Sequence, residues 1–165
     1  KSENTFEDDS TTGRGFAVYD MSYATGVSAS TIAIGLEVSI DENGILELKN
    51  ALASVDCGLA VNPDIVENQI AGGMIFGISN ALYGEITIKN GRVQQSNFND
   101  YPILGLKNSP RIKVYLAESD NDSPNGIGEG AVPVVIAALV DAIANAGGPR
   151  VRKLPILDAN GQFNS

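Results

Sequence analysis

One ionisable side chain lies inside a glycine-rich segment that leads directly into a long apolar stretch. Residues 125–133 read NGIGEGAVP, with glycines on both sides of Glu129. Glycines let a backbone adopt positive φ and approach its neighbours closely. Glu129 comes just before a predicted helix, where unpaired N–H groups and the helix dipole favour a charged carboxylate. A carboxylate held on such a frame can act as a positioned general base, although an ordinary loop with Glu129 as a first-turn helix residue fits the spacing too.

The composition excludes several kinds of site. The 165 residues contain no His and one Cys, so a Ser-His-Asp triad, a Cys-His dyad and a His-based zinc site cannot form from this chain alone. The formal charge is −9 with no basic stripe, which argues against binding to nucleic acid or to an anionic membrane surface. No apolar run has transmembrane length, which argues against membrane insertion. A start at Lys1 without Met suggests a fragment or processed piece, and no cellular compartment is indicated.

A helix with glycines in its middle is predicted earlier in the chain. Asn62 is a suitable N-cap and Pro63 a suitable first residue, and the helix is expected to run to about Tyr83, before Gly84. Either tight packing on the sheet or close approach to a cofactor would account for the helix-weakening glycines Gly72, Gly73 and Gly77. The core-facing residues are predicted to be Ile70, Met74, Ile78, Ala81 and Leu82.

Strand patterns surround the two helices. Residues 31–40 alternate large aliphatic with small or polar side chains, and an Asn43-Gly44 turn connects them to a second strand over 45–56. Further strands are expected at 15–19, 85–89, 92–95, 111–116 and 151–156, with a loop over 22–30, an irregular segment over 96–110 and a second helix from about Val134 to Asn145. Because the strands group as hairpins, the fold class is predicted to be α+β, with an antiparallel or mixed sheet and helices on one face. Both helix starts are expected to point to one rim, a suitable place for an anionic ligand.

The chain is predicted to divide into a mobile acidic lead-in over residues 1–13, one domain over 14–157 and a polar tail over 158–165. Cys57 is expected to be a buried, inert thiol, and Asp56 a turn or capping residue. Arg14, between two glycines, is either a surface residue or a contact for a phosphate or carboxylate.

Five motifs together resemble a known family in their order and spacing. They lie at 36–41 (LEVSID), 55–58 (VDCG), 61–63 (VNP), 69–73 (QIAGG) and 126–129 (GIGE). These motifs identify the chain as similar to the C-terminal part of the molybdenum-binding subunit of the xanthine dehydrogenase and aldehyde oxidase family. Residues 83–87 and 93–98 are most similar to the branch of isoquinoline oxidoreductase beta subunits and related bacterial aldehyde dehydrogenases.

The resemblance implies specific roles. Glu129 matches the active-site glutamate beside the molybdenum, which acts as a base during oxidation of an aldehyde or N-heterocycle with water as the oxygen source. Gln69 matches a pterin-binding glutamine, and Gly72, Gly73 and Gly128 match small residues near the cofactor. The implied cofactor is molybdopterin or its cytosine dinucleotide, with [2Fe-2S] clusters on a small partner subunit. No metal ligand is implied in this chain, because the cofactor would carry the molybdenum.

Two departures from the family pattern keep an alternative open. The family usually has Pro directly after the glutamate, whereas this chain has Gly130, which predicts a more flexible loop. A Gln-Gly-His stretch and a Phe-Gly loop, which belong to the preceding half of the family's large subunit, are absent here. The isolated chain is therefore predicted to be inactive without the remainder of that subunit. The alternative is a non-catalytic binding or assembly module that keeps the fold and has lost the activity.

Overall fold

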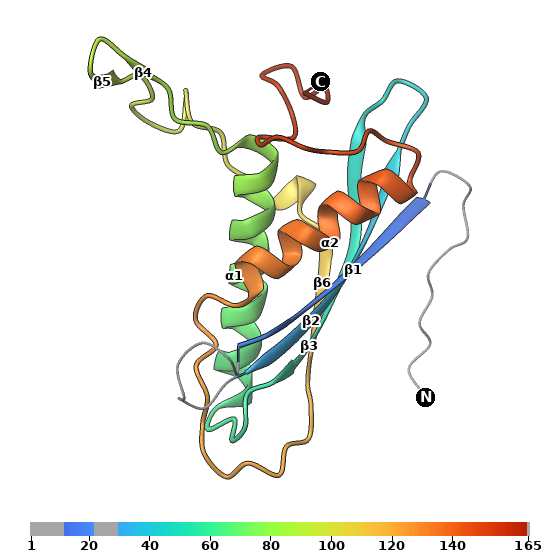
Figure 1. Ribbon diagram of the computed structural model, residues 1–165, viewed down its shortest axis with the longest axis vertical. Helices are drawn as coiled ribbons and strands as arrows, with labels where there is room; N and C mark the ends of the chain where they lie inside the picture. The colour runs from blue at the N-terminus through green and yellow to red at the C-terminus, as the bar shows by residue number, and fades with distance from the viewer. Residues whose placement is uncertain (1–11, 22–29, 165) are drawn as a thin grey trace.

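A four-stranded mixed sheet carries two helices on one of its faces in the computed structural model, which describes residues 12–21 and 30–164 (Figure 1). The strand order is β1-β2-β3-β6. The first three strands pair antiparallel, whereas β6 runs parallel to β3. This arrangement confirms the predicted α+β class. The bounds are Thr12–Asp20 for β1, Thr31–Ile40 for β2, Leu46–Asp56 for β3 and Arg111–Leu116 for β6.

The alternation along β2 sets which face of the sheet is buried. Ile32, Ile34, Leu36 and Val38 are all at most 2% exposed and face the helices. Fully burying an aliphatic side chain of this size contributes about 1.5–3 kcal/mol. The turn to β3 lies where it was predicted, and the Asp41 carboxylate accepts hydrogen bonds from the N–H groups of Asn43 and Ile45. Gly44 has the expected left-handed conformation with φ +78°, whereas Asn43 does not have positive φ. A bulge shifts the register between Glu37 and Val38.

Helix α1, Pro63–Tyr83, has the predicted bounds. The Asn62 side chain caps it by accepting a hydrogen bond from the Ile65 N–H at 3.2 Å. The five predicted core residues of this helix are all buried. Helix α2, Ala131–Asn145, begins three residues earlier than expected. Pro133 is tolerated there because an N–H in the first turn has no intrahelical acceptor.

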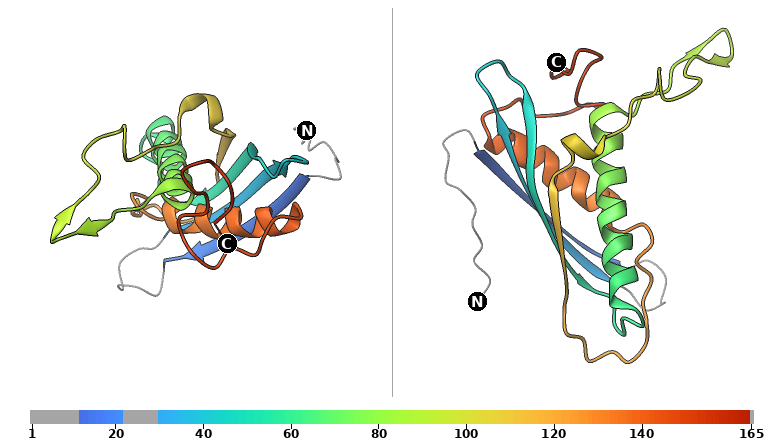
Figure 2. Two further views of the ribbon diagram at one scale, coloured as in Figure 1. Left: turned by 90° about the horizontal axis from the view of Figure 1, so that it is seen from above. Right: turned by 180° about the vertical axis from the view of Figure 1, so that it is seen from behind.

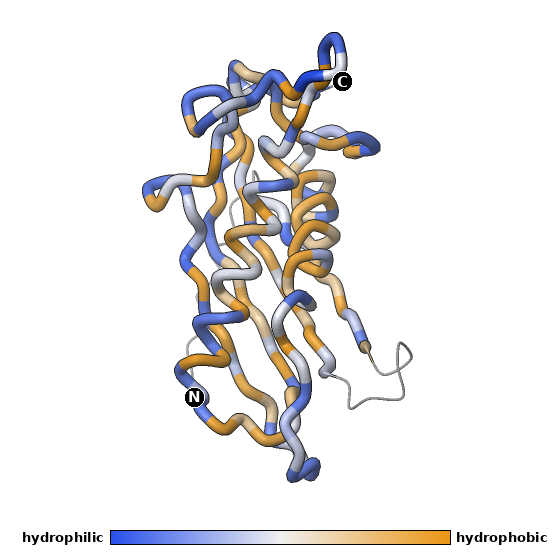
Figure 3. Tube along the Cα trace, turned by 90° about the vertical axis from the view of Figure 1, so that its left-hand side faces the viewer, coloured by the Kyte–Doolittle hydropathy of each residue, from blue (hydrophilic) through white to orange (hydrophobic). Residues whose placement is uncertain are grey.

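The two helices cross on the same side of the sheet (Figures 1 and 2). Helix α2 lies directly on β1, where a Cβ added at Gly15 would come within 2.0 Å of the Ala138 carbonyl oxygen. Helix α1 contacts α2 and lies beside β6. Apolar segments run through the helices and strands, while polar segments gather in the loops at the two ends (Figure 3). No helix of the described residues combines the length and the apolarity that crossing a membrane requires.

A second hairpin projects from the end of α1 (Figure 2). Its strands β4, Ile88–Lys89, and β5, Arg92–Val93, are shorter than predicted, and the Asn90-Gly91 turn has positive φ at both residues. The irregular segment that follows contains one short 3₁₀ helix, Leu106–Asn108. The prediction of a loop over 22–30 falls mostly on residues outside the described part of the chain.

The prediction of a strand over residues 151–156 is wrong. This segment forms bends, and the N–H groups of Ile156 and Leu157 donate to the carbonyls of Ala81 and Leu82 at 2.7 and 3.1 Å. Those carbonyls belong to the last turn of α1 and have no intrahelical donor, so they compete successfully with a sheet edge. At the other end, β1 begins at Thr12 and therefore includes the last two residues of the predicted lead-in. Residues 1–11 lie outside the described part.

Candidate functional site

The loop before α2 is held in place by hydrogen bonds to three other elements. Buried Ser30, next to β2, donates to the Gly126 carbonyl at 2.8 Å, and the Gln69 side chain of α1 donates to the Gly128 carbonyl at 3.0 Å. Upstream, the Asn125 N–H donates to the Cys57 carbonyl after β3 at 2.8 Å. The backbone that leads into Glu129 is therefore anchored at Asn125, Gly126 and Gly128, which is the property that a positioned carboxylate needs.

The glycines of this loop confirm the predicted close approach to neighbours, at Gly130, but not the predicted positive φ. None of Gly126, Gly128 and Gly130 has positive φ, so the expectation that they serve to reach that conformation is wrong. Gly130 is buried with φ −58°, and a Cβ there would lie 2.5 Å from the Ile32 side chain. A side chain at this position would displace the end of the Ile32 side chain, so close packing on the core favours glycine here. The prediction of a more flexible loop finds no support in this contact.

The three glycines of α1 have separate environments. A Cβ added at Gly77 would lie 2.5 Å from Val135 Cγ1 and 2.7 Å from the Val132 carbonyl oxygen, and one at Gly73 would lie 3.1 Å from Ala131 Cβ. These two glycines let α2 cross α1 closely, so the tight packing is on a helix and not on the sheet. At Gly72 an added Cβ would meet nothing within 4 Å. Gly72 therefore faces open space.

The helix crossing brings the predicted site residues to one pocket of about 370 Å³. Gln69, Gly72 and Gly73 line it from α1, and Gly128 and Glu129 line it from the loop. The side chains of Gln69 and Glu129 are exposed to this space. The pocket is lined in addition by Asn68, Phe76 and Val132, which sequence reasoning missed. An aromatic residue one helical turn after Gly72 is the signal that could have identified Phe76.

The expectation of a shared rim is correct only for α2. The start of α2 lies at the pocket, but the lining residues of α1 begin at Asn68, more than one turn after Asn62. The N-terminal dipole of α1 is consequently not directed into this pocket, because its effect falls off within the first turn.

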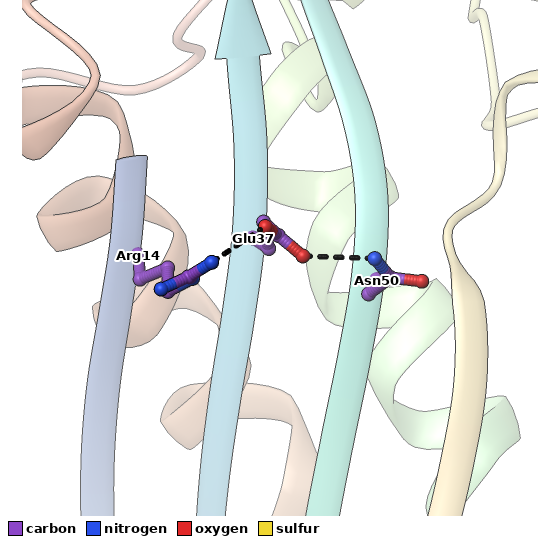
Figure 4. A network of polar contacts seen from close by, with 3 residues as sticks. All are labelled: Arg14, Glu37 and Asn50. Carbon is purple, nitrogen blue, oxygen red and sulfur yellow. Dashed lines mark hydrogen bonds and ion pairs between the residues drawn. The ribbon is translucent and has the colours of Figure 1, made fainter. Parts of the chain in front are cut away.

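The environments of Asp56, Cys57 and Arg14 are structural. Asp56 accepts a hydrogen bond from the Gly58 N–H at 3.0 Å, as a turn residue does. Cys57 is buried, and burial together with the neighbouring Asp56 carboxylate raises the pKa of its thiol. Arg14 contacts the carboxylate of Glu37 at 3.4 Å, on the sheet face away from the helices (Figure 4). Among the described residues, no group of three or more His, Cys, Asp or Glu side chains is arranged to hold a metal ion.

Comparisons with known proteins agree with this architecture. Residues 2–110 match the model of the molybdopterin cofactor-binding domain family, a match that ends before Glu129. The chain is 34% identical over 140 residues to the beta subunit of isoquinoline 1-oxidoreductase from Brevundimonas diminuta. The aligned region covers 84% of this chain and 18% of the relative. It is 33% identical over 153 residues to a nicotinate dehydrogenase subunit from Pseudomonas putida, covering 91% and 13%.

Solved structures show the same fold. Quinoline 2-oxidoreductase from Pseudomonas putida 86 superposes with a TM-score of 0.69 at 27% identity, over 78% of this chain and 17% of that one. The aldehyde oxidoreductase from Desulfovibrio desulfuricans superposes with a TM-score of 0.68 at 26% identity, over 78% and 15%. This chain thus spans less than one fifth of the length of these proteins. By its family-model match and its relatives, the chain belongs to the molybdopterin cofactor-binding domain family, among the molybdenum-binding subunits of the xanthine dehydrogenase and aldehyde oxidase type.

Proposed function

We propose that this chain supplies pterin contacts and the catalytic base of a molybdenum hydroxylase that oxidises an aldehyde or an N-heterocycle. The observation that carries the proposal is the pocket itself. Gln69 and Gly128, which are 59 positions apart, are joined there by a hydrogen bond beside Glu129 and the open Gly72. The relatives support the substrate class, because their names include isoquinoline, nicotinate and aldehyde.

The residues of the pocket suit a flat, polar cofactor such as a pterin. With its Nε2 donating to Gly128, the Gln69 side chain presents Oε1, which accepts no hydrogen bond from the described residues and can accept one from a ligand N–H. Gly72 leaves room for a ring because it has no side chain. The Phe76 side chain adds an apolar wall. Gly73 helps to shape the pocket by admitting α2.

Glu129 is the base in this proposal. Overall, a substrate C–H bond breaks, a C–O bond to an oxygen derived from water forms, and two electrons and two protons are released. When bound, the molybdenum pterin cofactor would accept the electrons. Glu129 takes up one proton, a task for which its anchored backbone and its open side chain are suited. The rest of the large subunit would complete the site, so the isolated chain is expected to be inactive.

The electrons would leave through a partner. A [2Fe-2S] cluster needs four Cys or His ligands, whereas this chain has one Cys and no His. We therefore assign the iron–sulfur clusters to a small partner subunit. In this chain, we assign residues 14–157 to the cofactor-binding segment and residues 158–165 to its tail.

Replacement of Glu129 in the complete enzyme tests the proposal. Glu129→Gln is expected to lower kcat by about 10²–10⁴-fold, because the amide cannot accept the proton. Molybdenum and pterin content should stay at the wild-type level, since the side-chain shape is kept. Glu67→Gln, an exposed position of α1 outside the pocket, is the matched control and should keep full activity. Wild-type turnover in the Glu129 variant would refute the base assignment and favour the alternative of an assembly module.

A further inference from the structure

The sheet face turned away from the helices carries exposed apolar side chains. Both helices pack on the opposite face, and Figure 4 shows them behind the strands. On the outer face, Phe16 and Val18 of β1 are 65% and 55% exposed, and Tyr115 of β6 is 38% exposed. Three large apolar residues on two strands of one face are more than the scattered single exposures of an ordinary surface. No element of the described residues covers them.

A hollow of about 460 Å³ lies between Phe16 and Tyr115. Its centre is formed by Ala33 and Gly35 of β2, and its sides by Phe16, Leu52 and Tyr115. A Cβ added at Gly35 would meet nothing within 4 Å. The small residues of the middle strand therefore leave a depression of a size that suits a large apolar side chain from outside.

An ion pair with a buried carboxylate borders this hollow. Glu37 is only 3% exposed although it lies on the outer face, and its carboxylate accepts hydrogen bonds from Arg14 at 3.4 Å and from Asn50 at 2.8 Å (Figure 4). The three residues come from β1, β2 and β3. They hold the strands in register at the place where the apolar hollow meets a polar one.

The neighbouring polar hollow, of about 480 Å³, is positively charged. Lys49 is paired with Glu47 and Arg14 with Glu37, so these four charges cancel. Two cations that line the polar hollow, Lys107 and Arg111, are outside these pairs. The apolar hollow has one charged lining residue outside the pairs, Asp141. A local positive excess is notable in a chain with a formal charge of −9. Complementarity favours an acidic partner surface here.

We infer that this outer sheet face is the docking surface for the remainder of the large subunit, whether it is joined to this chain or separate. The occupant would insert an apolar side chain over Gly35 and place acidic groups against Lys107 and Arg111. Relatives at 33–34% identity match this chain over only 13–18% of their length, so a large polypeptide is available to cover the face. The inference rests on the proposed function, in which this chain works as part of that subunit.

Lysine acylation of the complete enzyme tests the docking surface. Lys113 lies on the outer side of β6, above the Tyr115 ring at 4.8 Å, whereas Lys89 lies in the projecting hairpin, and both are exposed in this chain. Relative to the denatured enzyme, Lys113 is expected to react at least about tenfold more slowly in the native enzyme, and Lys89 at an unchanged rate. Equal labelling of the two lysines would overturn the inference. So would cross-links from Lys113 to a second copy of this chain.

A glycine replacement provides the second test. Gly35→Val fills the hollow without an internal clash and suits a strand, so the domain should fold with wild-type circular dichroism and thermal unfolding. In the complete enzyme it is expected to restore labelling of Lys113. Gly105→Ala, at an open loop position with φ −81° outside both hollows, should leave Lys113 protected. A folded Gly35→Val enzyme with full protection of Lys113 would refute the docking site. Because labelling requires no turnover, failure of the Glu129 test would leave this result unaffected.

Discussion

The side-chain amide of Gln69, in the second turn of α1, donates a hydrogen bond to the Gly128 carbonyl 3.0 Å away. This bond joins the helix with the pocket-lining glycine to the loop that carries Glu129. It couples the position of the proposed base to the position of the proposed pterin contact. A disturbance of one is therefore expected to affect the other.

Removal of the Gln69 amide should loosen the loop. Gln69→Met keeps the length of the side chain but cannot donate to Gly128. The free energy of unfolding is expected to fall by only about 0.5 kcal/mol, because the bond is exposed to solvent. In the complete enzyme, cofactor content and kcat should both fall, since a pterin contact and the anchor of Glu129 are lost together. Metal analysis and steady-state kinetics measure these effects, and Glu67→Met, at an exposed position of α1 outside the pocket, is a control for stability. Unchanged cofactor content and kcat in Gln69→Met would contradict the coupling.

Two glycines of α1 should respond oppositely to alanine. Gly72→Ala is expected to stabilise the chain by up to about 1 kcal/mol, because the added methyl group has space and alanine favours the helix. Gly77→Ala should destabilise it by about 1–3 kcal/mol, because the methyl group meets Val135 and the Val132 carbonyl. Urea denaturation compares the two variants. Equal effects would show that the helix crossing tolerates movement.

The same Gly72→Ala substitution should reduce the pterin content of the complete enzyme, because the methyl group enters the pocket beside Gln69. The variant would then combine higher stability with lower cofactor occupancy. Wild-type cofactor content would remove Gly72 from the proposed contacts.

Burial, and not distance, should decide which ion pair matters for stability. Arg14–Glu37 is the longer pair at 3.4 Å, but its carboxylate side chain is only 4% exposed, while Lys49–Glu47 at 2.6 Å is exposed on both sides. Arg14→Met leaves a buried carboxylate that still accepts a hydrogen bond from Asn50, and should cost about 1–2 kcal/mol after discounting for the half-exposed arginine. Lys49→Met should cost less than about 0.5 kcal/mol. A larger loss for Lys49→Met in denaturant unfolding would contradict this order.

Cys57 should react slowly with thiol reagents. Burial first, and the Asp56 carboxylate second, raise the pKa of the thiol, so the reactive thiolate is scarce at neutral pH. Labelling by a disulfide reagent at about pH 7.5 is expected to be more than tenfold slower in the native chain than in urea, and to accelerate as the pH rises toward the raised pKa. Asp56→Asn, which removes the carboxylate charge, should increase the native rate modestly. Equal native and denatured rates would show that the thiol is accessible.

Local signals were sufficient for much of this fold. The bounds of β2 and α1, the Asn62 cap, the buried face of α1 and the positions of both Asn-Gly turns follow from residues within a few positions of each other. Period, capping and turn chemistry are properties of short segments, so they can be recognised in a sequence. The ordered motifs also indicated the family correctly.

Tertiary contacts decided the rest, because they join residues far apart along the chain. Only the fold shows that β6 runs parallel to β3 and that residues 151–156 bind the end of α1 instead of forming a strand. In the sequence, Glu37 is an ordinary polar residue on the outer side of a predicted strand. In the fold, Arg14 and Asn50 enclose its carboxylate. The three glycines of α1 are alike in sequence, and the crossing of α2 alone separates Gly77, which is packed, from Gly72, which is open. Burial and close approach depend on which elements meet in space, and that information is not local.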